Sequence, residues 1–335
     1  MEALDRQLLN VLQRSVPLVP RPFAALGSPL GIDEEEALSR TRRLKDRGII
    51  RQIGPIFSSS RLGYQSTLVA FQVEPGRLDD VAAVVSAHPG VSHNYSRNHN
   101  YNLWFTLTIP SRDSIGETIF RLAAAGQVTE YLNLPSLMRF KLGVHFDMSN
   151  RAGDSMTPER DSDRPQPPVN KAKEQVRPMT TFERGLVRQL QGDMNLVAHP
   201  FRYPAAALGI TEQQLLEAAR DLNKRGIMRR FSAVLKHRRA GFRANGMGCW
   251  VIPEERVVEA GKTAAGFAAV SHCYQRPAFP PQWPYNLFTM VHGHTREEVQ
   301  GIVARIHKKI GPVQYTILYS QKEYKKQRVR YFVDD

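Results

Sequence analysis

The sequence Leu44-Lys-Asp-Arg-Gly-Ile-Ile-Arg51 returns later in the chain as Leu222-Asn-Lys-Arg-Gly-Ile-Met-Arg229. A second stretch, Gly90-Val-Ser-His-Asn-Tyr95, returns as Ala269-Val-Ser-His-Cys-Tyr274 at almost the same spacing. A repeat with this long period decides the architecture of a whole chain. The 335 residues therefore predict two copies of one structural plan.

Helix signals lead into both copies of the eight-residue stretch. An amphipathic run begins at Asp33 in the first copy and at Thr211 in the second, and each run stops at a glycine, Gly48 or Gly226. Asp and Thr are good N-caps, and glycine readily takes the left-handed conformation that ends helices. Residues that favour β-structure follow each glycine. This order predicts a winged helix-turn-helix domain in each copy. The two predicted domains are residues 1–62 and 180–240.

The rest of each copy alternates strand and helix signals in the order βαββαβ, which is typical of a ferredoxin-like domain. These domains are predicted at 63–148 and 241–335. Two helices cover one face of such a sheet and leave the other face open. We therefore expect an α+β fold in which the two open faces pack together as an intramolecular pseudo-dimer. Residues 149–179 are rich in proline and charge, which predicts a flexible linker.

Composition excludes several classes of protein. No stretch of the chain approaches the roughly 18 uninterrupted apolar residues of a membrane span. Cys249 and Cys273 are too few for a disulfide framework or a four-thiolate metal site. We therefore expect a soluble cytoplasmic protein without a membrane partner. The formal net charge of +14, most of it in residues 180–335, favours a polyanionic partner.

DNA is the first polyanion to consider for a winged helix. The second helix of such a domain uses its first turns to contact base edges. Here those turns are acidic, because they carry Asp33, Glu34, Glu35 and Glu36 in one copy and Glu212 in the other. Carboxylates at these positions repel phosphates. We expect no specific binding of DNA.

Polar side chains of several kinds gather on one predicted β-hairpin, residues 91–107. Strand alternation places His93, Tyr95 and Arg97 on one face, and the turn brings His99 and Tyr101 near them. One histidine on a strand is more often structural than catalytic. Imidazoles, a phenol and a guanidinium on one face instead favour a site for an anionic ligand.

The second copy repeats most of this pattern. His272, Tyr274, Arg276 and Tyr285 recur at matching positions, but Trp283 takes the place of His99. The tyrosines in both copies also suit an apolar core between sheets. Repetition with the same neighbours favours a functional role for the histidines and arginines.

At these residues the chain resembles the siroheme decarboxylases, which share the fold of the Lrp/AsnC transcription regulators. The run His-Asn-Tyr-x-Arg-x-His-x-Tyr-Asn-Leu-Trp at 93–104 resembles one subunit type, and His-Cys-Tyr-x-Arg-Pro at 272–277 resembles the other. Leu134-Pro-Ser136 and Phe140-Lys-Leu-Gly143 match as well. The resemblance covers nearly all of both halves, so the chain is similar to a fusion of two partner subunits.

The resemblance implies removal of two acetate carboxyl groups from siroheme, as carbon dioxide, to give 12,18-didecarboxysiroheme in d1-haem or haem biosynthesis. It implies no dissociable cofactor, because the iron belongs to the substrate, and no protein-bound metal. The alternative is an Lrp/AsnC-type transcription regulator that senses a tetrapyrrole or an amino acid. Further oligomerisation of the pseudo-dimer stays open.

Candidate residues follow from the chemistry of that reaction. Loss of carbon dioxide leaves a carbanion that must be protonated, and an imidazole can deliver the proton or can bind the substrate iron. The expected catalytic residues are His93, His99, His272 and Tyr95. The carboxylates of the substrate require cations, and the reacting acetate would pack against aromatic rings. The expected substrate-binding residues are Arg97, Tyr101, Arg139, Lys141, Tyr274, Arg276, Trp283, Tyr285, Lys326 and Arg330.

Overall fold

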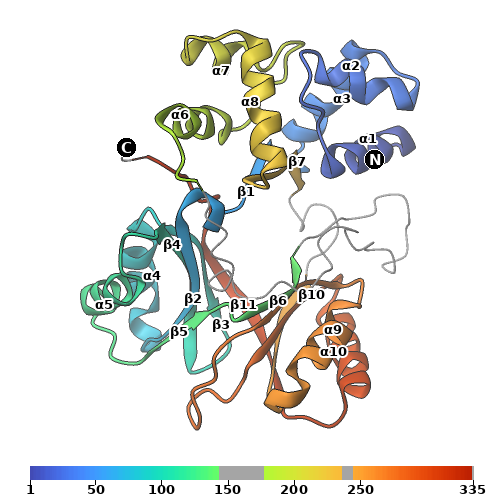
Figure 1. Ribbon diagram of the computed structural model, residues 1–335. Helices are drawn as coiled ribbons and strands as arrows, with labels where there is room; N and C mark the ends of the chain where they lie inside the picture. Colours follow the sequence, from blue (N-terminus) through green and yellow to red (C-terminus); the bar gives the residue numbers. More distant parts are fainter. Residues whose placement is uncertain (143–176, 236–243, 334–335) are drawn as a thin grey trace.

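The computed structural model describes residues 1–142, 177–235 and 244–333, and it arranges them in a helical layer above a sheet layer (Figure 1). The predicted linker at 149–179 lies almost wholly outside the described residues. No helix in the described ranges has the length and apolar character needed to cross a bilayer.

The helical layer contains three α-helices from each copy. They are α1 (Ala3–Arg14), α2 (Pro22–Gly27), α3 (Glu34–Asp46), α6 (Thr181–Leu190), α7 (Arg202–Ala207) and α8 (Glu212–Lys224). As predicted, the Asp33 and Thr211 side chains cap α3 and α8. Gly48 and Gly226 follow these helices with φ values of +66° and +67°, the left-handed region that favours glycine.

The strands that follow these glycines pair with each other across the two copies. β1 (Ile50–Phe57) and β7 (Met228–Leu235) form a two-stranded antiparallel sheet, in which Ile53 lies opposite Ala233. The sequence suggested a separate wing in each copy. Each copy offers a single strand at this point, and pairing across the copies satisfies the backbone groups of both.

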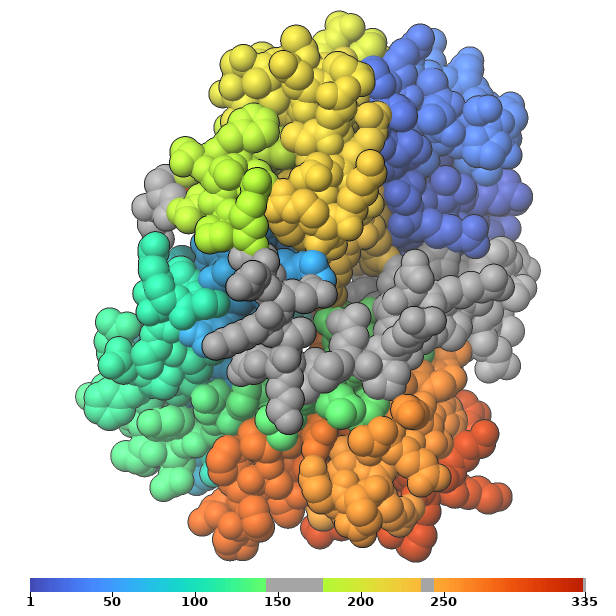
Figure 2. Space-filling model, viewed as in Figure 1, coloured from blue at the N-terminus to red at the C-terminus, as the bar shows by residue number. Residues whose placement is uncertain are grey.

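One apolar core joins the two winged-helix domains, which abut along the upper face of the molecule in Figure 2. It includes Leu8 and Leu44 from the first domain, Leu186 and Leu222 from the second, and Phe332 from the C-terminal segment. Polar bonds also cross the boundary. Arg42 of α3 donates to the Leu196 carbonyl oxygen, and Lys45 pairs with Asp193 at 2.7 Å. These contacts hold α3 against the second winged-helix domain.

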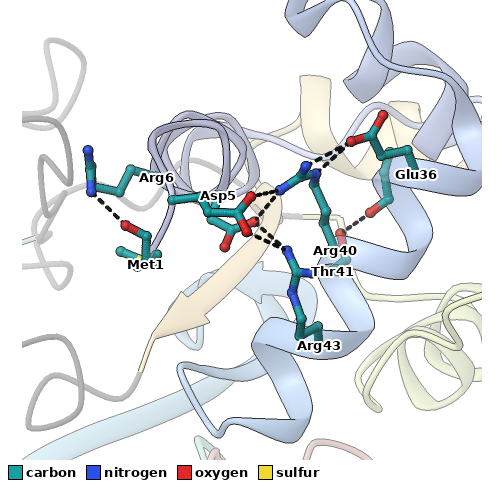
Figure 3. Close-up of polar contacts among 9 residues, drawn as sticks. Met1, Asp5, Arg6, Glu36, Arg40, Thr41 and Arg43 are labelled. Atoms are coloured by element: carbon teal, nitrogen blue, oxygen red, sulfur yellow. Dashed lines mark hydrogen bonds and ion pairs between the residues drawn. The ribbon is translucent and has the colours of Figure 1, made fainter.

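A buried carboxylate ties α1 to α3 (Figure 3). Asp5 accepts hydrogen bonds from Arg40 at 2.9 Å and from Arg43 at 3.1 Å. Burial opposes ionisation of Asp5, but the two guanidiniums more than offset it and hold the pKa of the carboxyl below its usual value.

The sheet layer consists of two modules with the same order of elements. The first module contains β2 (Tyr64–Gln72), α4 (Leu78–Ala87), β3 (Val91–Arg97), β4 (Tyr101–Pro110), α5 (Ile115–Ala125), β5 (Tyr131–Pro135) and β6 (Met138–Leu142). The second module contains β8 (Ala244–Trp250), α9 (Val257–Ala265), β9 (Val270–Gln275), β10 (Leu287–Gly293), α10 (Arg296–Ile310) and β11 (Tyr315–Lys326). This is the predicted α+β repeat.

The modules exchange their last strands. The nine strands follow the order β5-β2-β4-β3-β11-β8-β10-β9-β6. β11 first pairs with β8 of its own module and then continues along β3 of the first. In return, β6 of the first module pairs with β9 of the second. This exchange covers β3 and β9, which would otherwise be exposed sheet edges.

Alternation along each strand separates two kinds of core. In β4, Leu103 and Phe105 face the helices of the first module, whereas Trp104 belongs to a cluster shared by both modules. Met247 and Leu318 join that shared cluster from the second module. The open sheet faces therefore bury apolar surface against each other.

Candidate active site

Equivalent β-bulges shape the two strands that carry the histidines. Between β3 and β4, Ser92 is an extra residue, and between β9 and β10 the extra residue is Ser271. A bulge turns neighbouring side chains to new directions and is common beside active sites. Beyond the first bulge, Asn94 bonds to the Ala82 carbonyl oxygen on α4. His93 and its alternate neighbours consequently face away from the helices.

Two guanidiniums, Arg97 buried and Arg276 half-buried, occupy equivalent positions beyond the bulges. Arg97 donates to the Leu318 carbonyl oxygen at 3.1 Å, and Arg276 donates to the Leu134 carbonyl oxygen. Within 1–142, 177–235 and 244–333, the Nε atoms of both arginines lack a partner and no carboxylate lies within 4.0 Å of either. Burial lowers the pKa of each guanidinium to about 10, so both stay charged at neutral pH. Buried cations without a counter-ion are costly and mark a site for an anion.

The two imidazoles are neutral. The His93 Nδ1 lies 3.0 Å from the Ser92 Oγ, and the His272 Nδ1 lies 2.7 Å from the Ser271 Oγ. Burial, reinforced by nearby cations, lowers the pKa of each imidazole to about 4. His272 is itself close enough to His93 to contribute to that lowering.

The C-terminal strand β11 adds charged side chains to the first cluster, which consists of His93, Tyr95 and Arg97. Its Lys326 lies opposite His93, and its Glu323 lies opposite Tyr95. Lys326 helps lower the pKa of His93. Burial, and then Glu323, raise the pKa of the Tyr95 phenol, which therefore keeps its proton.

In the second cluster, the exchanged strand β6 also supplies a cation, but beside the tyrosine, because Leu142 is the residue that lies opposite His272. Arg139 of β6 lies opposite Tyr274 of β9. Burial and the neighbouring Arg229 lower the pKa of Arg139. Arg276 lies over the Tyr274 ring at 4.9 Å, a cation–π contact.

Sequence reasoning missed the cations that the helical layer contributes. Arg51 donates to the Lys326 carbonyl oxygen at 2.5 Å and acts electrostatically on His93. Arg229 occupies the same place in the second copy and acts on Tyr274 and Arg139. The signal was present, because both copies of the eight-residue repeat end in these arginines.

Comparisons with known proteins agree with this arrangement. The family described as "Siroheme decarboxylase NirDL-like HTH domain" matches residues 5–51 and 183–229, and "AsnC-like ligand binding domain" matches 61–141 and 239–325. A siroheme decarboxylase of Hydrogenobacter thermophilus is 41% identical over 98% of this chain and 95% of its own length. The chain belongs to the siroheme decarboxylase family.

Two further relatives extend the comparison with siroheme decarboxylases. The alpha subunit of the Desulfovibrio desulfuricans enzyme is 48% identical but covers 45% of this chain and 86% of its own length. A crystal structure of the siroheme decarboxylase NirDL, in complex with an iron-uroporphyrin III analogue, has a TM-score of 0.74 and 35% identity. That match covers 99% of this chain and 95% of the other.

His99 lies apart from His93 in this member of the siroheme decarboxylase family. Arg97 lies four residue steps beyond His93 along the strand, about 13 Å at the usual rise, and His99 follows in the turn. The His99 ring packs edge-on against Trp283 at 5.3 Å, and Trp283 is fully buried beside Tyr101 and Tyr285. Trp283, Tyr101 and Tyr285 thus form an aromatic wall at the Arg97 end of the strand.

Two expected binding residues also lie elsewhere. Lys141 is buried, and its Nζ donates to the Ala265 and Phe267 carbonyl oxygens, each at 2.9 Å, where α9 ends. In this placement the ammonium caps a helix, so the structure gives Lys141 a structural role where the sequence predicted substrate binding. Arg330 is exposed, whereas the nearby Arg328 turns inward and donates to the Pro55 carbonyl oxygen at 3.0 Å.

Proposed function

We propose that this chain is a siroheme decarboxylase, which removes carboxyl groups from acetate side chains of siroheme as carbon dioxide. The observation that carries the proposal is a pair of guanidiniums, Arg97 buried and Arg276 half-buried, that have no counter-ion among the described residues. Siroheme carries eight carboxylates on a flat macrocycle. Its anionic rim would neutralise cations that the folded chain leaves uncompensated.

Cations from three sources would bind the carboxylates that do not react. Arg97 and Arg276 lie on the central strands, Arg139 lies on the exchanged strand, and Arg51 and Arg229 come from the helical layer. Arginine suits this task because its planar fork binds carboxylate through two bonds and stays charged at any working pH.

Decarboxylation breaks the bond between the acetate methylene and its carboxylate. Carbon dioxide leaves, the electron pair passes into the conjugated macrocycle, and a proton then takes the place of the carboxylate. We assign delivery of that proton to His93. Its imidazole is neutral, but the carboxylates of bound siroheme would raise its pKa and allow it to pick up a proton. Tyr95 would exchange its hydrogen bond to Glu323 for one to a neighbouring carboxylate of siroheme.

Finer features of the proposal rest on the resemblance. The expected product is 12,18-didecarboxysiroheme, formed without a dissociable cofactor, by one chain that acts as an intramolecular pseudo-dimer of two subunit types. The copies differ where Trp283 replaces His99, so their clusters have diverged. We assign the proton-delivering role to the first copy.

The alternative, a transcription regulator, is not favoured. α3 begins with carboxylates, and Arg42 and Lys45 of the same helix bond to residues of the second winged-helix domain. These contacts leave the helix poorly suited to enter a DNA groove.

Incubation with siroheme under anaerobic conditions tests the proposal. Mass spectrometry is expected to show product that is lighter by the mass of two carbon dioxide molecules. Siroheme that binds but is recovered unchanged would refute the activity. A His93→Gln variant, which keeps a polar side chain of similar size, is the matched control and is expected to bind siroheme without rapid turnover.

A further inference from the structure

The second module contains a chain of hydrogen bonds that leads inward from His272. The His272 Nδ1 lies 2.7 Å from the Ser271 Oγ, and the same hydroxyl lies 2.6 Å from the His292 Nε2. The His292 Nδ1 lies 2.8 Å from the Asn245 Oδ1. Ser271 is fully buried and His292 is 6% exposed, so these bonds are shielded from water.

The direction of each hydrogen bond in this chain follows from Asn245, the residue at its inner end. An amide oxygen only accepts, so the His292 Nδ1 carries the proton that Asn245 accepts. In the neutral form of the His292 ring the Nε2 is bare, and it accepts the proton of the Ser271 hydroxyl at 2.6 Å in preference to the Met290 carbonyl oxygen at 3.3 Å. The Ser271 oxygen is left to accept from the His272 Nδ1–H. The Nε2 of His272 is consequently the nitrogen with a free lone pair.

The first module lacks this chain. Ser92 lies 3.0 Å from the His93 Nδ1, as in the second module. The positions that match His292 and Asn245 are Thr108 and Ser66, which lie opposite each other on β4 and β2. Their hydroxyls bond to each other at 2.5 Å. No ring is present at Thr108 to fix the direction of the Ser92 bond.

We propose that Ser271, His292 and Asn245 are positioning residues that hold His272 in the Nδ1-protonated tautomer, so that its Nε2 presents a lone pair to the substrate. Such outer partners commonly fix the tautomer of a functional histidine. The inference that the lone pair meets siroheme rests on the proposed function. The two histidines would then have different tasks: His272 acts as an electron-pair donor, toward the macrocycle iron or an acidic proton, and His93 acts as the group that changes protonation.

The tautomer itself is measurable without any substrate. Long-range ¹H–¹⁵N NMR of protein labelled at histidine distinguishes Nδ1–H from Nε2–H rings, and a His272→Gln variant identifies the signals of His272. We expect Nδ1–H rings for both His272 and His292 in the wild type. In Ser271→Ala, His272 is expected to shift toward the Nε2–H form. Ser271→Thr restores the hydroxyl and should restore the wild-type signals. Ser92→Ala, the matched change in the first module, should leave the His272 signals in place.

A second readout uses iron-uroporphyrin III as the probe. Its absorption spectrum when bound should change between wild type and Ser271→Ala, and Ser271→Thr should return it to the wild-type spectrum. An Nε2–H ring for His272 in the wild-type protein would overturn the inference, as would wild-type signals and spectrum in Ser271→Ala. A wild-type enzyme that shows the Nδ1–H ring but leaves siroheme unchanged would refute the proposed function and not the tautomer.

Discussion

The Arg97 guanidinium of the first module donates to the Leu318 carbonyl oxygen of the second. Arg276 of the second module makes the equivalent bond to Leu134 of the first. Each arginine is therefore held by a strand of the opposite module. Neither half of the chain supplies its own arginine site, which gives a physical reason for two copies to act together.

Replacement of either arginine by methionine is expected to weaken binding of siroheme while the fold is retained. Arg97→Met and Arg276→Met keep an unbranched side chain but remove the charge. A hydrogen bond to a charged group contributes about 1.5–3 kcal/mol, so the dissociation constant should rise about 10-fold to 100-fold for each variant. Absorbance titration measures this constant.

Thermal unfolding provides the control for both variants. An uncompensated buried charge is removed, so the free energy of unfolding should stay level or increase. Wild-type affinity in both variants would contradict the role assigned to these guanidiniums.

Separation of His93 from His99 leads to different expectations for the two histidines. His93→Gln is expected to lower kcat by about 10²-fold or more, since general acid catalysis contributes about 10²–10⁴-fold. In His99→Gln, the amide can still accept from the Tyr101 amide nitrogen as the His99 Nδ1 does, so kcat should fall only a few-fold. Single-turnover kinetics with siroheme measure both values. A larger loss in His99→Gln than in His93→Gln would reverse the assignment.

The sequence predicted the repeat, the order of elements and the face shared by His93, Tyr95 and Arg97. These features follow from local periodicity and capping, which a chain displays residue by residue. The bulges at Ser92 and Ser271 leave no such signature, because they appear as a change of register between partner strands.

Long-range pairing accounts for what the sequence did not reveal. Nothing local indicates that β1 pairs with β7 or that β6 leaves its own module for β9. The same exchange takes Lys141 to the end of α9, where it caps a helix. Arg51 and Arg229, which end the repeat, lie on the paired strands β1 and β7 and so meet the site from a different layer.

Lys141→Met is expected to reduce stability and not binding. The substitution removes two hydrogen bonds from the Nζ to carbonyl oxygens at the end of α9, which then lose their partner in a buried place. The expected loss is about 1–3 kcal/mol in the free energy of unfolding. Lys325 bonds to the Ser86 and His88 carbonyl oxygens in the same way, so Lys325→Met is the matched variant. Denaturant unfolding measures the loss, and unchanged stability in both variants would contradict the capping role.

Arg51→Met and Arg229→Met test the contribution of the helical layer. Both are expected to raise the dissociation constant for siroheme several-fold, because each removes a cation that acts on a functional side chain. Arg188→Met is the control in the same layer, because Arg188 of α6 donates to the Phe332 carbonyl oxygen. This variant is expected to keep the affinity of the wild type. Equal affinities for the wild type, Arg51→Met and Arg229→Met would show that the winged-helix layer does not take part in binding.

The lowered pKa of His93 and His272 predicts how stability depends on pH. Each imidazole titrates near pH 4 in the folded chain and near 6.5 when unfolded, so the unfolded chain binds more protons between these values. The free energy of unfolding should therefore decrease as the pH falls from about 6.5 to 4, with a slope of up to about 1.4 kcal/mol per pH unit for each histidine. Above about pH 6.5 these two groups contribute no slope.

Variants separate this contribution from that of other titrating groups. His93 is faced by Lys326, Arg51 and His272, and Arg276 and Lys141 act on His272. The lysines and arginines among these groups stay charged over the whole range, so they add no slope of their own. Denaturant unfolding of His93→Gln and His272→Gln at a series of pH values should show a shallower decline than the wild type. An equally steep decline in both variants would mean that the imidazoles are already protonated in the folded chain. It would contradict the assignment of His93 and His272 as neutral groups.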